Sequence, residues 1–217
     1  MKSIAQQLDE ADIMLTNAMQ HPIVRQRLAE YGYPLTRLET GMQNLNATRL
    51  QVSTKNDLYT QKESSDKAFR TDMAQLKSWF TEHRRIAKLA FRHQAAKYDS
   101  LQLDAPVQRR QAPWLAQVDA FYSKLLPQSK VMQRYDVPKS ELEQAQATVE
   151  SLKATRIARF QTKGEAQHAT QQQALALKEL RQWLTRFKAA ARLALVDEPQ
   201  LLEILGIVVP AGARSRA

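Results

Sequence analysis

The chain has 217 residues, with 32 Lys and Arg against 22 Asp and Glu, so it carries a formal net charge of +10 at pH 7. It contains no cysteine, which excludes disulfides, thiolate nucleophiles, cysteine-ligated zinc and iron–sulfur clusters. No window has the apolar length of a membrane span or of a secretory signal core, so we expect a soluble, cytoplasmic protein. With 5 glycines and 8 prolines, the composition favours long helices.

The first predicted helical segment covers roughly residues 4–29. A second helix is predicted to begin at a capping box formed by Thr36 and Glu39, with Pro34 holding the entering chain extended. Further along, apolar or small residues recur every three or four positions, at 69, 73, 76, 80, 87 and 90. His83 fills the one missing position of this stripe. The spacing predicts a helix packed in a bundle or coiled coil.

The same pattern returns in the second half of the chain. Shifted by 104 positions, the run from Leu76 to Phe80 falls on the run from Leu180 to Leu184, and tryptophan meets tryptophan. A segment at roughly 113–132 and a capping box at Ser140 and Glu143 repeat the earlier elements. A second stripe occupies positions 177, 180, 184, 187, 191 and 194. This self-similarity indicates an internal duplication.

The predicted fold is therefore all-α. We expect an elongated antiparallel helical bundle built from two tandem copies of a two- or three-helix unit, related by an approximate internal two-fold. The first copy covers 1–106 and the second covers 107–210, and a flexible basic tail follows at 211–217.

The number of helices in each copy depends on one polar stretch. Asn56 and Gly164 occupy similar places in the two copies, and these residue types readily adopt the left-handed conformation that ends a helix. We favour a turn at this point, which gives three helices per copy. The alternative is a single helix of roughly 60 residues, about 90 Å long at 1.5 Å per residue.

The chain closes with a short predicted helix after the last long one. Asp197 is expected to cap it, Pro199 to lie in its first turn and Gly206 to end it. The run from Leu180 to Leu195, followed by the run from Pro199 to Ile207, resembles an uncharacterised group of bacterial all-helical proteins with this two-copy layout. The resemblance implies a helical fold and no particular site residue.

No set of residues matches a known catalytic, metal or cofactor motif, so we expect a protein that is not an enzyme and has no cofactor. Glu165 and His168 have the spacing of a di-iron ligand pair, but no second such pair exists. The glycines are too scattered for a phosphate-binding loop. We interpret His83 as a hydrogen-bonded core histidine, and Trp79 and Trp183 as packing residues rather than base-stacking ones.

The basic residues are the best indication of function. Lys77, Arg84 and Lys88 lie within about 20° of a common line along a helix, at 100° per residue. In the second copy these positions are taken by Arg181, Lys188 and Arg192. Two hypotheses follow: a non-enzymatic helical scaffold that binds a protein partner or a second copy of itself, or a protein that binds nucleic acid or another polyanion through these ridges. In either case we expect no membrane-spanning segment.

Overall fold

The computed structural model describes residues 2–208 and is built from helices. Helix accounts for 85% of the described residues and none of them lies in a strand, so the all-α prediction is confirmed. The expected basic tail at 211–217 lies outside the described residues. Within that part of the chain, no helix combines the length and the apolar character needed to cross a membrane.

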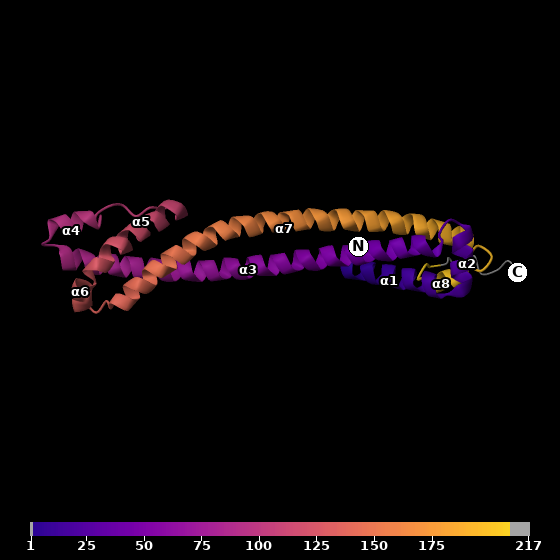
Figure 1. Ribbon diagram of the computed structural model, residues 1–217, viewed down its shortest axis with the longest axis horizontal. Helices are drawn as coiled ribbons and strands as arrows, with labels where there is room; N and C mark the ends of the chain where they lie inside the picture. Colours follow the sequence, from indigo (N-terminus) through magenta and orange to yellow (C-terminus); the bar gives the residue numbers. More distant parts are fainter. Residues whose placement is uncertain (1, 209–217) are drawn as a thin grey trace. The chain divides into compact units, whose positions relative to one another are not determined.

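Two helices are much longer than the others, namely α3 and α7 (Figure 1). In chain order the elements are α1 (Ile4–Gln20), α2 (Pro22–Glu30), α3 (Leu35–Phe91), α4 (Ala95–Ser100), α5 (Gln111–Leu125), the 3₁₀ turn η1 (Leu126–Gln128), α6 (Ser129–Met132), the 3₁₀ turn η2 (Gln133–Tyr135), α7 (Lys139–Ala194) and α8 (Gln200–Ile204). The segments expected at 4–29 and 113–132 are each interrupted. The breaks fall at Pro22 and Pro127, since proline has no amide hydrogen to continue a helix.

The turn expected at Asn56 and Gly164 is wrong, because both residues lie inside continuous helices. The alternative of one long helix per copy is the correct one. Asn and Gly permit a left-handed cap but do not impose it. A glycine inside a helix costs about 1 kcal/mol, whereas ending two helices there would leave several backbone groups without partners.

The capping boxes expected at the starts of the long helices are also wrong. These helices begin at Leu35 and Lys139, so Thr36 and Ser140 already lie within them. The prolines themselves take the cap position: the amide of Leu38 donates to the carbonyl of Pro34, and the amide of Leu142 donates to that of Pro138. Proline costs no helix hydrogen bond at this position, because the backbone amide of a cap residue has no acceptor within the helix.

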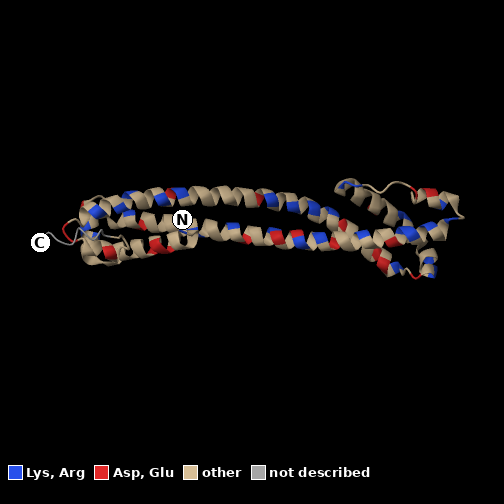
Figure 2. Ribbon diagram, turned by 180° about the vertical axis from the view of Figure 1, so that it is seen from behind, with Lys and Arg blue, Asp and Glu red and all other residues tan. Residues whose placement is uncertain are grey.

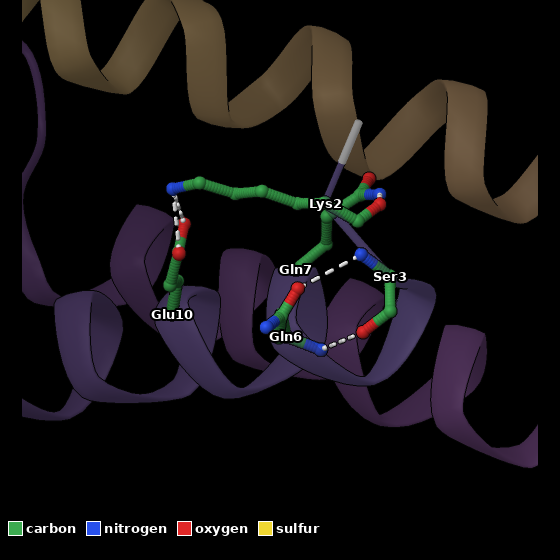
Figure 3. Close-up of polar contacts among 5 residues, drawn as sticks. All are labelled: Lys2, Ser3, Gln6, Gln7 and Glu10. Atoms are coloured by element: carbon green, nitrogen blue, oxygen red, sulfur yellow. Dashed lines mark hydrogen bonds and ion pairs between the residues drawn. The ribbon is translucent and has the colours of Figure 1, made fainter.

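A capping box does occur at the start of α1 (Figure 3). The amide of Gln6 donates to the Ser3 hydroxyl at 3.2 Å, and the amide of Ser3 donates to the Gln6 side chain at 3.0 Å. Lys2 reaches over this turn to Glu10, with Nζ 2.6 Å from the carboxylate. Gln7 donates to the Lys2 carbonyl at 2.9 Å, so the first turn of α1 is held by side chains throughout.

The chain forms two compact units, and each contains segments from both sequence copies. Unit 1 consists of Met1–Tyr59 and Glu165–Ala217, and unit 2 consists of Thr60–Gly164. Each unit therefore combines the first part of one long helix with the last part of the other, and α3 packs against α7 in both. Unit 1 also contains α1, α2 and α8, and unit 2 contains α4, α5 and α6. Residue 106, where the two predicted sequence copies meet, lies inside unit 2, so the boundaries of the units differ from those of the copies.

The predicted stripes supply the core of each unit. In unit 2, Phe69, Leu76, Phe80 and Ala87 are buried against α5 and the first turns of α7. In unit 1, buried or partly buried residues of the second stripe pack against α1, α2 and the start of α3, and these are Leu180, Leu184, Phe187, Ala191 and Ala194. The interpretation of both stripes as packed seams is confirmed.

The two matched tryptophans are packing residues, as expected. Trp79 is partly buried against the core of unit 2. In unit 1, Trp183 stacks on Phe187 with ring centroids 5.4 Å apart and meets the edge of Tyr33 at 5.7 Å. Its indole lies directly over Gly41, where a Cβ would come within 2.5 Å of a ring carbon. Only glycine allows α3 to approach the indole this closely.

Candidate functional site

Unit 2 contains a groove of about 590 Å³ between α3 and the segment that joins α4 to α5. One wall is the α3 face that carries the first predicted basic ridge. The other wall is formed by residues 107–109 and the first turn of α5. All of its lining residues belong to unit 2.

The lining of the groove combines positive charge with an apolar floor. None of the lining residues is acidic, and five are cationic: Lys77, Arg84, Arg85, Lys88 and Arg109. The apolar lining residues are Met73, Phe80, Val107 and Trp114. Phe80 and Trp114 are almost fully buried and meet edge to face, with centroids 6.1 Å apart. Val107 stands at the rim and is 49% exposed.

Arg84 is used to hold the loop wall in place. Its guanidinium donates to the carbonyl of Leu103 at 2.6 Å and also to the carbonyl of Ala105. Two carbonyl oxygens of an otherwise irregular segment thus receive a charged donor from α3. Charge-assisted hydrogen bonds of this kind are stronger than neutral ones. The structure therefore assigns Arg84 to shaping the groove.

Lys88 also contributes to the loop wall, through Asp104. Its Nζ lies 2.9 Å from the Asp104 carboxylate, and the Tyr98 hydroxyl donates to the same oxygen at 3.0 Å. The hydrogen bonds from Lys88 and from Tyr98 lower the pKa of Asp104 below its ordinary value. The bond to Asp104 raises the pKa of Tyr98. The loop is thus held to α3 by two basic side chains.

Gln117 of α5 fixes the loop from its other side. Its side-chain oxygen accepts from the amide of Gln108 at 2.9 Å, and its side-chain nitrogen donates to the carbonyl of Pro106 at 3.0 Å. Backbone polar groups that would otherwise face water are bonded to one amide side chain. Contacts within the chain therefore hold the groove wall from both sides.

Three cations of the groove remain available to a ligand. The ammonium of Lys77 lies 5.9 Å from the centre of the Trp114 ring, on the floor of the groove. Within residues 2–208, neither Arg85 nor Arg109 has an acidic partner, and both are exposed. Lys77 and Arg85 project from α3, whereas Arg109 comes from the loop wall. Free positive charge thus lines both sides of the groove.

The second predicted ridge lies in unit 1, on the last part of α7. Arg181 donates from Nε to the side chain of Gln7 at 2.8 Å, which ties it to the first turns of α1. Lys188 is half-buried and Arg192 is exposed. A shallow hollow near Arg181 is lined by residues of α7 alone. The six predicted residues therefore divide into three that line a groove and three on a helix surface.

The positive charge of the chain is concentrated in unit 2. That unit carries 19 Lys and Arg against 11 Asp and Glu, a net charge of +8. The rest of the sequence carries 13 against 11, a net charge of +2. Figure 2 shows basic residues on both long helices. The net charges of the two units differ because acidic residues balance a larger share of the basic ones in unit 1. The groove thus lies in the strongly basic part of the chain.

Unit 2 also contains a buried polar cluster that joins three helices. His83 of α3 is fully buried, with Nδ1 3.0 Å from the Tyr122 hydroxyl and Nε2 2.9 Å from the Glu141 carboxylate. Burial raises the pKa of Tyr122, and the nearby Glu141 charge raises it further. Every polar atom of the imidazole has a partner, so the interpretation of His83 as a hydrogen-bonded core histidine is confirmed.

Glu165 and His168 lie inside the continuous helix α7, and Nε2 of His168 is 3.3 Å from Nε2 of Gln172. Among the described residues, no group of three His, Cys, Asp or Glu side chains is placed to hold a metal ion.

Sequence reasoning missed the second wall of the groove. Val107 gave no signal, because the segment from 101 to 110 has no periodic pattern and only folding brings it onto α3. Trp114 and Gln117 lie in the helical segment expected at 113–132, but no spacing places its first turns beside α3. The adjacent Arg109 and Arg110 were the one local sign of positive charge there. Comparisons with protein-family models, with curated proteins and with solved structures found no match for this chain.

Proposed function

We propose that this protein is a non-enzymatic interaction protein that binds an acidic partner in the groove of unit 2. The observation that carries the proposal is the lining of the groove, in which five cations and no acid surround an apolar floor. An anionic group that enters meets positive charge on both walls. The net charge of +8 on unit 2 adds a longer-range attraction for such a partner.

The order of the groove supports this proposal. Arg84, Lys88 and Gln117 already hold the loop wall, so a ligand need not bear the entropic cost of fixing it. An apolar floor lowers the local dielectric, which strengthens attraction between the free cations and an anion. The site offers no nucleophile and general base in contact, and a binding role is the simplest use of these residues.

Binding to fluorescein-labelled poly-L-glutamate, followed by anisotropy at low ionic strength, tests the proposal. Changing Lys77, Arg85 and Arg109 together to Gln removes the free cations and leaves Arg84 and Lys88 to hold the loop. We expect affinity to fall about tenfold or more, since three contacts of about 0.5–1 kcal/mol each are lost. The melting temperature should hardly change, because these side chains make no ion pair.

The chain offers a matched control. Changing Arg181, Lys188 and Arg192 to Gln removes the same charge from unit 1, at positions that do not line the groove of unit 2. Under the proposal, this variant binds poly-L-glutamate within about twofold of wild type, because none of the three side chains lines the groove. Equal losses in the two triple variants would refute the groove as the binding site.

A second candidate function is nonspecific binding of nucleic acid along the cationic residues of α7. It is favoured by Arg192 and its exposed basic neighbours on this helix. Duplex DNA should then bind with an affinity that falls as salt rises, with a log–log slope of about 0.9 per phosphate contact. The triple substitution of Lys77, Arg85 and Arg109 changes no residue of α7 and should leave that slope nearly unchanged. A slope unchanged by the Arg181, Lys188 and Arg192 substitutions would count against this candidate.

A further inference from the structure

Building on the proposed function, we propose that the groove receives an acidic amphipathic helix of a partner protein. Apolar side chains of that helix would lie on the floor, and its carboxylates would meet Lys77, Arg85 and Arg109. The argument comes from the length of the cationic row, from the placement of charge on two walls and from the chemistry of the floor.

The cationic row is too long for a compact small anion. Lys77 and Arg85, the two available cations of α3, lie eight positions apart, which corresponds to about 12 Å at 1.5 Å per residue. Somewhat more than two turns of a second helix have the same length. A helix laid along α3 could therefore present a carboxylate at each turn to the basic wall, as in helix-in-groove recognition.

The distribution of charge across the groove fits the cross-section of an amphipathic helix. Lys77 and Arg85 come from α3, and Arg109 comes from the loop on the other side. Between them lie Phe80 and Trp114, and Val107 is 49% exposed at the rim. A ligand that matches the cations on both walls and the apolar residues between them has an apolar stripe with acidic residues on both sides. Apolar residues at i, i+4 and i+7 of a helix form such a stripe.

Nucleic acid satisfies only part of this lining. The phosphates of a duplex would meet the cations, but its backbone presents no apolar group to the exposed Val107 side chain and the neighbouring floor. An acidic peptide without apolar residues would leave the same surface in water. Burial of apolar area is the term that separates the proposed partner from both, because it adds affinity that salt does not screen.

A random peptide library displayed on phage and panned against the full-length protein tests this inference. The library is first depleted on the variant in which Lys77, Arg85 and Arg109 are changed to Gln. We expect enriched peptides to combine several acidic residues with Leu, Phe, Trp or Met at helical spacing. Synthetic versions should bind wild type at least tenfold more tightly than the variant, and shuffled versions of equal charge should lose most of that affinity.

Trp114 provides a direct optical readout of occupancy. An apolar side chain on the groove floor should change tryptophan emission on binding, and Trp114→Phe should abolish the change, whereas Trp79→Phe should not. An emission change of equal size in the Trp114→Phe variant would place the peptide elsewhere and overturn the inference.

The other outcomes separate this inference from the proposed function. Enrichment of purely acidic peptides, or equal affinity for shuffled ones, overturns the amphipathic helix but leaves an acid-binding groove. Preferential binding of duplex DNA over every enriched peptide also overturns it. If poly-L-glutamate and all peptides bind wild type and the triple variant alike, the proposed function itself fails.

Discussion

The two units have corresponding elements but different chemistry at corresponding positions. Each combines the start of one long helix, the end of the other and a preceding pair of shorter helical segments. In unit 2 the seam holds His83, bonded to Tyr122 and Glu141, whereas the position 104 residues later is Phe187, stacked on Trp183. The packing scheme therefore accepts either a polar cluster or aromatic rings at the same point of a seam.

The basic residues at the surface also differ in their surroundings between the two units. Lys77, Arg84 and Lys88 correspond to Arg181, Lys188 and Arg192 in sequence, but the first set lines a groove with two walls, whereas the hollow at Arg181 is lined by described residues of α7 alone. The difference comes from the loop at 101–110, which Arg84 and Lys88 hold against α3. A row of cations on a helix thus lines a groove where another segment forms a second wall.

The aromatic seam of unit 1 should be the most sensitive to truncation. Phe187 is fully buried and contacts both Trp183 and Tyr33. We expect Phe187→Ala to lower the free energy of unfolding by about 3–5 kcal/mol, because it leaves a cavity among packed rings. Urea denaturation measures the change. Gln182→Ala, at an exposed position of the same helix, should change stability by less than about 0.5 kcal/mol, and similar losses at both would mean that the seam is misassigned.

The polar cluster of unit 2 should respond differently to a smaller change. Tyr122→Phe removes only a hydroxyl but leaves Nδ1 of buried His83 without its partner, which should cost about 1–3 kcal/mol. In a His83→Phe background, which copies the residue of unit 1, the same substitution should be neutral or stabilising. Double-mutant cycles by urea denaturation measure this coupling. An equal cost in both backgrounds would show that the hydroxyl matters independently of His83.

Two glycines offer a comparison in which the sign of the effect differs between the units. Gly41→Ala in unit 1 should destabilise by about 1–3 kcal/mol, because its Cβ would collide with the packed Trp183 ring. Gly164→Ala in unit 2 meets nothing within 4 Å and lies inside a helix, so it should stabilise by about 1 kcal/mol. Thermal melts followed by circular dichroism distinguish the two. Destabilisation at both would contradict the continuous α7.

The smallest expected effect concerns the loop wall of unit 2, at residues 101–110. Because the pKa of Asp104 is lowered in the folded state, its bonds to Lys88 and Tyr98 are fully present above the ordinary pKa of aspartate, about 3.9. They are lost as pH falls through the lower folded-state value. The backbone amides of residues 101–110 should therefore become less protected from hydrogen exchange as pH falls through the folded-state pKa of Asp104.

Asp104→Asn is the control for this pH effect. The variant should show weaker protection of the loop at neutral pH and no further loss from this group on acidification. Protection that falls equally in wild type and variant would assign the acid sensitivity to another group.

The parts that the sequence predicted are those governed by periodicity. Phe69, Leu76, Leu180 and Phe187 recur at helical spacing, and this alone identified the buried seams and the all-α fold. The errors arose where several local arrangements are compatible with the same residues. Gly164 permits a turn but also fits a helix, and Pro34 serves as a cap as well as a preceding residue. Such choices depend on packing that is distant in sequence.

The candidate site was predicted only in part for the same reason. Lys77, Arg84 and Lys88 share a helix face, which a periodic argument finds directly. Lys77 lies over the Trp114 ring, whereas Arg84 and Lys88 hold the loop. This division depends on the carbonyls of Leu103 and Ala105 and on Asp104, which lie in an irregular segment. No spacing rule connects that segment to α3.

The composition of the two units has a consequence for how the chain folds as it is synthesised. Unit 2 is a continuous stretch, Thr60–Gly164, whereas unit 1 needs segments from before and after it. All of unit 2 can thus leave the ribosome before α8 and the last part of α7 have been made. Contacts distant in sequence form more slowly than local ones, and synthesis adds a further delay. Residues 4–59 therefore emerge before unit 2, but their contacts with α7 form only when that helix is complete. Until then, the apolar side chains of α1 and α2 that pack against α7 remain exposed.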